Sequence, residues 1–269
     1  MILACCPVLA LVSMFNIRLG TDLSFRFLYD FTLHYLFVDP LSFIFGLTFC
    51  ILGVVGGIYS CHNKSPLEAL CSMAYVGSSI GVVLAHDWIT FLCFWEMEAV
   101  ASTFLIWNDP RPGSRGAGIR YILIHTLSGN CVLFGVIMKL VAGDLLVHNL
   151  AAGPHDLAFW LILLGFLINA AAVPLHGWLI DGYPAATLTG SVFMSSCTTK
   201  VAVYALLRVF GGTELLIGVG VLMALYGATF AVMENDMIRL LSYHIVSQVG
   251  YMVAGAGIGT LMSLNGATA

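Results

Sequence analysis

The chain has 269 residues, of which 60% are apolar and only 9% are charged, and its net charge is −4 at neutral pH. A soluble domain carries about 25% charged residues to face water, so this composition, with a mean hydropathy of +0.98, excludes a soluble protein and places the chain in a lipid bilayer. The basic residues are scattered, which excludes nucleic acid as a partner, because phosphate binding needs clustered Lys and Arg.

Apolar runs long enough for membrane helices recur along the whole chain. A helix needs about 20 apolar residues to cross the hydrocarbon core, and the polar joints between the runs are short. The sequence therefore predicts one all-α, polytopic transmembrane bundle over residues 1–269, without a soluble domain. Its expected helices, about nine in number, lie near 1–17, 38–61, 67–86, 88–107, 118–140, 157–175, 188–209, 214–233 and 239–262.

The basic residues in the joints predict an orientation. The 108–120 joint holds three arginines, Arg111, Arg115 and Arg120, against one acid, and the positive-inside rule places such a joint in the cytoplasm. Counting helices outward puts Lys64 and Arg239 on the same side. Arg18, Arg26 and Arg208 then fall on the opposite side.

The cysteines indicate packing rather than metal chemistry. The eight of them show no CxxC or comparable ligand spacing, and six lie inside apolar runs, where a free Cys behaves as a small hydrophobic residue. Thiolate ligands of zinc or iron–sulfur clusters come in spaced pairs. We find no quinone, flavin or nucleotide motif either, so no cofactor is expected in this chain.

Charges inside the predicted helices are the strongest functional signal. Glu96 and Glu98 lie in the helix that Trp88 and Trp107 frame as expected interface anchors, and Lys200 lies inside the 188–209 run. A charge at the membrane centre costs roughly 2.5–3.5 kcal/mol or more and defaults to a functional role. Two readings stay open: a proton relay between Glu96 and Lys200, which is favoured, or a static buried pair. Glu98 points away from Glu96 on a helix.

The stretch 171–191 predicts a broken helix. Pro174 and Pro184 each remove a helix hydrogen bond, and His176 and Asp181 supply polar groups between them. Irregular backbone at membrane depth survives only inside protein or beside water, and such breaks build ion sites in transporters. The alternative is an ordinary surface loop.

Three further polar side chains lie within predicted helices: Asn169, His125 and His244. Each of them can form hydrogen bonds that hold neighbouring helices together. The two histidines can also pass protons, because histidine changes charge near physiological pH.

Five segments together resemble the antiporter-like subunits of respiratory complex I, membrane-bound hydrogenases and Mrp-type cation/proton antiporters. They are FVDPLSFIF (37–45), FWEMEAVASTFLI (94–106), PLHGWLIDGYPAATLTGSVF (174–193), TTKVAVYALLR (198–208) and ENDMIRLLSYHIVSQVGYM (234–252). The resemblance implies inverted five-helix repeats with a broken helix in each, here about 67–210 for the first and 214–269 for the start of an incomplete second. It also implies that Glu96 is the glutamate of the first half-channel and that Lys200 hands protons onward.

The resemblance carries its own expectations about activity and surroundings. It implies a proton-translocating subunit in a bacterial or archaeal inner membrane, with other membrane subunits and the lipid bilayer as partners. Protons are the expected ion, with Na+ as a second candidate. Such a chain is at most a non-catalytic subunit of an oxidoreductase complex.

Two departures from the family pattern favour an alternative, a structural membrane scaffold that has lost conduction. Asn169 replaces the lysine that usually partners the glutamate, which leaves Lys200 or His125 as candidate partners of Glu96. Family members are also nearly twice as long, so the chain is expected to be a fragment or a split subunit.

Overall fold

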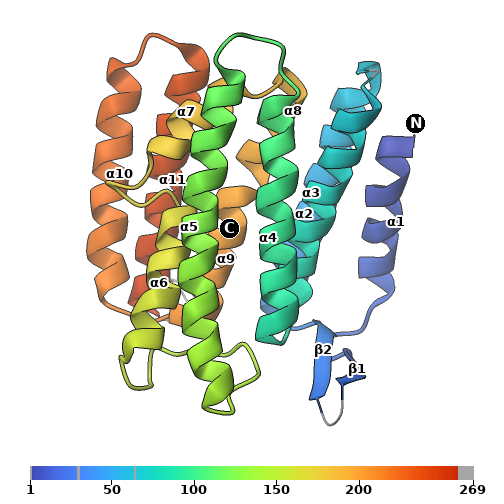
Figure 1. Cartoon of the computed structure of the whole chain (residues 1–269), viewed down its shortest axis with the longest axis vertical. Coiled ribbons are helices and arrows are strands. Elements are labelled where there is room, and N and C mark those ends of the chain that lie inside the picture. Colours follow the sequence, from blue (N-terminus) through green and yellow to red (C-terminus); the bar gives the residue numbers. More distant parts are fainter. Residues whose placement is uncertain (1, 29–30, 64, 260–269) are drawn as a thin grey trace.

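The computed structural model describes residues 2–28, 31–63 and 65–259, and most of this part of the chain is helical (Figure 1). Its helices are α1 (Ile2–Asn16), α2 (Pro40–Tyr59), α3 (Pro66–Leu84), α4 (Trp88–Trp107), α5 (Ser114–Val141), α6 (Leu157–Asn169), α7 (Gly177–Ala185), α8 (Leu188–Ser196), α9 (Thr198–Phe210), α10 (Leu215–Met233) and α11 (Met237–Ile258), with a 3₁₀ turn at Ser60–His62. Six segments are long and apolar enough to cross a membrane, with α8 and α9 together forming one of them.

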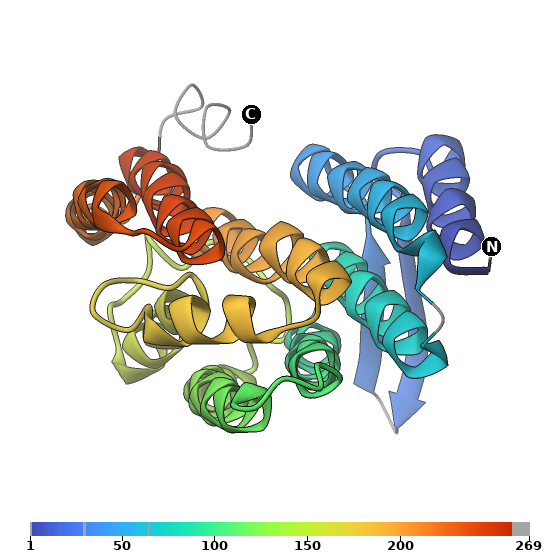
Figure 2. The same ribbon diagram turned by 90° about the horizontal axis from the view of Figure 1, so that it is seen from above.

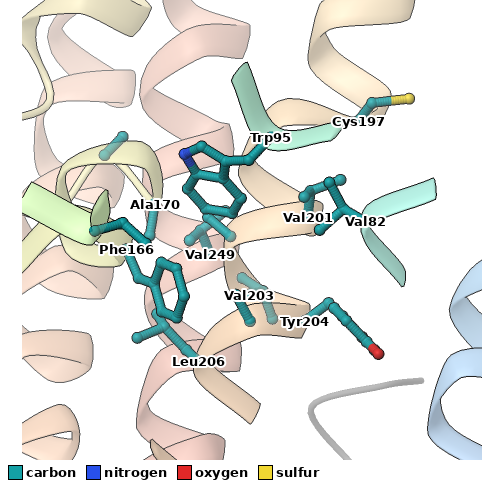
Figure 3. Packing of buried hydrophobic residues seen from close by; sticks show 14 of the residues in the cluster. Val82, Trp95, Phe166, Ala170, Cys197, Val201, Val203, Tyr204, Leu206 and Val249 are labelled. Carbon is teal, nitrogen blue, oxygen red and sulfur yellow. The ribbon is translucent and has the colours of Figure 1, made fainter. Parts of the chain in front are cut away.

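The helices stand side by side in a bundle with α9 at its centre. Consecutive helices pack as neighbours from α1 to α6, while α9 touches α3, α6 and α11. Seen from above, α1–α3 lie on one side and α10 and α11 on the other, with α8 and α9 between them and α4–α7 along one edge (Figure 2). Aromatic and branched side chains from α4, α6 and α9, among them Trp95, Phe166 and Leu206, meet in the buried core (Figure 3).

The helices α10 and α11 pack with their backbones in close approach. A Cβ atom added at any of four glycines of this pair would overlap backbone atoms of the facing helix. Small residues permit this approach in membrane helices, where van der Waals contact replaces the hydrophobic drive as the source of association. The four positions are Gly220, Gly227, Gly250 and Gly257.

Three boundaries differ from those expected from sequence. The joint after the first helix forms an antiparallel hairpin of β1 (Asp22–Leu28) and β2 (Phe31–Phe37), because apolar and polar residues alternate there with a strand period of two. The helix expected to reach residue 175 ends at Asn169, and the 188–209 run is divided at Cys197 into α8 and α9. The last residues of the 239–262 prediction lie outside the described part.

The two tryptophans expected as interface anchors have different surroundings. Trp107 is exposed at the end of α4, as an anchor would be, but Trp88 is fully buried and contacts Phe91 edge to face. Trp88 is therefore part of the core, since the start of α4 is covered by the chain itself. The main chain there pairs with the 145–147 segment.

The two ends of the bundle carry different polar groups. Arg239 and the arginines Arg111 and Arg120 line one cavity, so the expectation that Arg239 and the 108–120 joint share a side agrees with the fold. We call this the arginine end. At the other end, the hairpin end, Asp39 caps α2 and accepts a 2.8 Å hydrogen bond from Arg208 of α9.

Asp39 ties the start of α2 to the end of α9. Burial acts to raise the pKa of Asp39, but the Arg208 charge and hydrogen bonds from Ser42 outweigh it and hold the pKa below its usual value. A carboxylate with a lowered pKa stabilises the fold above its ordinary pKa, and this stabilisation is lost as the pH falls through the lower value.

We expect Asp39→Asn to lower the free energy of unfolding by about 1.5–3 kcal/mol at neutral pH, the usual contribution of a hydrogen bond to a charged group, because asparagine keeps the helix cap but loses the ion pair. The difference from the wild type should close below about pH 4, measured by thermal unfolding in detergent. Asp236→Asn is the matched control, because Asp236 caps α11 without an ion-pair partner among the described residues. An equal loss in both variants, or a loss that persists in acid, would contradict the account.

Candidate functional site

Glu96 lies on the outer face of α4, exposed on the surface of this chain. Its carboxylate sits over Gly129 of α5, where a Cβ atom would overlap Oε1. Within the described residues, no side chain forms an ion pair or hydrogen bond with this carboxylate. Glu96 is therefore positioned by the space that a glycine leaves on the neighbouring helix.

Lys200 lies at the break between α8 and α9, not at the centre of one continuous helix. It is the third residue of α9, and its Nζ donates a 2.6 Å hydrogen bond to the backbone carbonyl of Ser195, on the other side of the break at Cys197. The interruption gives the amine a carbonyl partner inside the membrane. The proline-free sequence around Cys197 gives no signal of this break.

Residues 170–176 separate α6 from α7 and form the predicted break. Asn169 ends α6 with only 5% of its surface exposed, and its Oδ1 is buried without a partner in the described part of the chain. Trp178 donates a 2.9 Å hydrogen bond from Nε1 to the carbonyl of Ile168. A protein group therefore satisfies the carbonyl just before the break, as a bilayer requires, whereas Pro174 and Leu175 within the break are exposed on this chain.

The predicted prolines and histidine of the broken segment lie at different places. Pro174 is within the irregular 170–176 segment, whereas Pro184 is inside α7, where its carbonyl accepts a 3.0 Å hydrogen bond from Arg111. His176 directly precedes α7, and its ring packs 4.7 Å from the Tyr226 ring of α10. The segment is thus fixed from both α10 and the arginine end.

The two histidines expected to pass protons have opposite environments. His125 of α5 is buried, with its ring stacked 4.1 Å from the Tyr121 ring and edge to face 4.6 Å from the Trp178 ring. His244 is exposed on α11. In the described part of the chain, neither Lys200 nor His125 lies within hydrogen-bond distance of Glu96, so the expected direct partners are not in contact.

Sequence reasoning misses one buried carboxylate, Glu68 near the start of α3. It accepts hydrogen bonds from Asn108 at 3.0 Å, from Thr187 at 2.7 Å and from Thr189. Thr187 and Thr189 lie at the junction between α7 and α8, so Glu68 fastens α3 to this second interruption. Its place in a charged joint conceals the role, because such joints usually face water.

The other acid that the sequence underrates is Glu98. It is 3% exposed and faces the interior of the bundle, where it accepts a hydrogen bond from Ser79 of α3. The sequence does indicate that Glu96 and Glu98 point in different directions, but apolar residues are spread over all sides of α4 and its few polar residues do not gather on one face. No polar face therefore shows which of the two acids faces inward.

Comparisons with known proteins agree with this architecture. The family model described as "NADH:quinone oxidoreductase/Mrp antiporter, TM" matches residues 85–269. A Na(+)/H(+) antiporter protein of Alkalihalophilus pseudofirmus, named as one subunit of that antiporter, is 30% identical over 248 residues, which are 83% of this chain and 31% of the relative. NADH-quinone oxidoreductase subunit M of Escherichia coli is 30% identical over 266 residues, which are 87% of this chain and 52% of the relative.

Solved structures show the same fold. The structure of the Mrp complex from Dietzia sp. superposes with a TM-score of 0.89 at 26% identity, covering 99% of this chain and 32% of that chain. Respiratory complex I from Thermus thermophilus superposes with a TM-score of 0.81 at 23% identity, covering 96% of this chain and 58% of that chain. The chain thus spans from about a third to just over half of the length of these relatives. It is an integral membrane protein and belongs to the family of antiporter-like membrane subunits shared by NADH:quinone oxidoreductases and Mrp antiporters.

Proposed function

We propose that this chain conducts protons within a multisubunit membrane complex, using Glu96 and Lys200 as the groups that bind and release them. The observation that carries the proposal is the position of Lys200, whose amine is held inside the membrane at an interrupted helix. Ionisable groups at this depth usually mark an ion path, and interrupted helices supply the polar backbone groups that such a path needs. Family membership supports the same function.

The arrangement of the helices supports a first repeat over about residues 67–210. It would comprise α3, α4, α5, the interrupted pair α6–α7 and the interrupted pair α8–α9. The helices α10 and α11, within 214–269, would begin the second repeat. Other membrane subunits are the proposed partners, because the relatives are named as parts of larger assemblies.

Na+ is proposed as a second ion, exchanged against protons. This rests on the name of the Alkalihalophilus pseudofirmus relative. Whether the complex is a redox-driven pump or an exchanger depends on its partner subunits, which mass spectrometry of the native complex identifies. Flavin and iron–sulfur proteins would indicate a pump, and small helical antiporter subunits would indicate an exchanger.

Asn169 favours the alternative of a structural scaffold. An asparagine cannot titrate, and the structure shows no direct contact between Glu96 and Lys200 to replace a glutamate–lysine pair. Under the scaffold hypothesis, Glu96 and Lys200 have no role in transport, and their removal changes neither proton movement nor the exchange of Na+ against protons.

We expect Glu96→Gln and Lys200→Met to lower proton movement by the native complex at least tenfold, because each removes a group that binds the proton, while the complex still assembles. The measurement is the pH gradient across inverted membrane vesicles, with and without added Na+. Glu214→Gln is the matched control, since Glu214 is an exposed acid just before α10. Normal proton movement by assembled Glu96→Gln and Lys200→Met complexes would favour the scaffold.

A second variant tests the position of Glu96 without removing its charge. Gly129→Ala places a methyl group where the Glu96 carboxylate now lies, so the flexible acid must swing away and proton movement should fall several-fold in the same vesicles. Gly116→Ala, on the same helix, meets only the end of Arg120 at 3.6 Å and should be silent. Equal activity of the two alanine variants would show that the position of Glu96 does not matter.

A further inference from the structure

Glu98 is a carboxyl group enclosed in the bundle without a cation. Only 3% of its surface is exposed, and Ser79 Oγ donates to its Oε1 at 3.3 Å. No lysine, arginine or histidine of the described residues forms an ion pair with it. A buried carboxylate without a cation is strongly destabilising, and such groups hold a proton instead. Glu98 is therefore stable in this position as a neutral acid.

A set of hydroxyl groups surrounds the break between α8 and α9, beside Glu98. Tyr75 of α3 forms a close hydrogen bond with Thr198, and its hydroxyl also accepts a 2.8 Å bond from the Thr198 amide. Tyr121 of α5 donates to Ser102 at 2.9 Å, and Tyr183 of α7 donates to the Met194 carbonyl at 2.9 Å. We call Ser79, Ser102, Thr198 and the three tyrosines the hydroxyl cluster.

The hydroxyl cluster extends from Glu98 to the break that holds Lys200. Ser79 bonds to the Glu98 carboxyl group and to the carbonyl of Tyr75. Tyr75 and Tyr183 both donate to the carbonyl of Met194, the residue before Ser195, whose own carbonyl binds Lys200. Five helices, α3, α4, α5, α7 and α9, thus bring polar side chains to one interior region, whereas Glu96 faces outward from the same turn of α4.

We infer that Glu98 is a second proton-carrying acid, which exchanges its proton with Lys200 through the hydroxyl cluster at the α8–α9 break. When the proton passes from the Glu98 carboxyl group to a neutral Lys200 amine, a carboxylate and an ammonium form, and the reverse transfer restores both neutral groups. Each hydroxyl gives one proton and receives another, so it is unchanged at the end. This inference rests on the proposed function, because it gives Lys200 an internal proton donor.

The deciding variant is Glu98→Gln, which retains an oxygen that can accept from Ser79 but cannot release a proton. We expect the complex to assemble and proton movement in inverted vesicles to fall at least tenfold. Tyr75→Phe removes one hydroxyl of the cluster and should lower it several-fold. The infrared carbonyl band of a neutral buried acid should be present in the native complex and absent from Glu98→Gln.

The outcomes separate the two proposals. If Glu98→Gln conducts normally while Glu96→Gln and Lys200→Met do not, the inference about Glu98 is wrong and the proposed function stands. If all three variants conduct normally, the proposed function fails as well. Should Glu98→Gln not assemble, Glu98→Asp replaces it, because it keeps the acid: the infrared band should then shift, and an unshifted band would overturn the inference.

Discussion

The structure depends on one constraint: inside a bilayer, every backbone polar group must find its partner within the protein. This chain interrupts its helices at 170–176, at the α7–α8 junction and at Cys197, so polar side chains must lie at each interruption. Trp178 donates to a backbone carbonyl at the first, and Thr187, which is held by Glu68, accepts from the Gly190 amide at the second. Lys200 serves the third through the Ser195 carbonyl. Around the breaks, the folding requirement alone therefore places polar side chains next to the interrupted backbone.

The same arrangement supplies the chemistry that we propose. A side chain that donates a hydrogen bond to a free carbonyl has a fixed position. An amine or hydroxyl group fixed in this way can also bind a proton that is being transported. This explains why Lys200 can be both a structural partner of Ser195 and a transport residue. Glu96 is different, because it is exposed on this chain and has no backbone group to satisfy. The remaining contacts of the Glu96 carboxylate are made by the groups that pack against the outer face of α4.

The sequence predicts much of the fold, because the length of an apolar run is almost enough to identify a membrane helix. The ends of α2, α4 and α10 fall within a few residues of the expected positions, and Pro174 with its neighbouring glycines marks the first break. The break at Cys197 is not predictable in this way, since no proline or glycine marks it. The hairpin at residues 22–37 is also missed, because its charged residues are typical of a joint, although polar and apolar side chains alternate along it.

The site is harder to predict than the fold, for a physical reason. Depth in the membrane follows from position along a helix, and Glu96, Glu98 and Lys200 all stand out as charges within apolar runs. The direction in which each side chain points depends on which neighbours cover the helix, and the residues of α4 are not divided into an apolar and a polar face. Contacts between distant segments, such as Glu68 with Thr187, leave no local pattern at all.

The close approach of α10 and α11 bears on movement. Because the two backbones are in direct contact at the four glycines, rotation or sliding of one helix against the other would bring larger side chains into these close contacts. We therefore expect α10 and α11 to move as one unit rather than as two independent helices. His176, which adjoins the first break, packs against Tyr226 of α10. A rearrangement of the 170–176 backbone at His176 would thus act on α10 and α11 together, including the start of α11 at the arginine end.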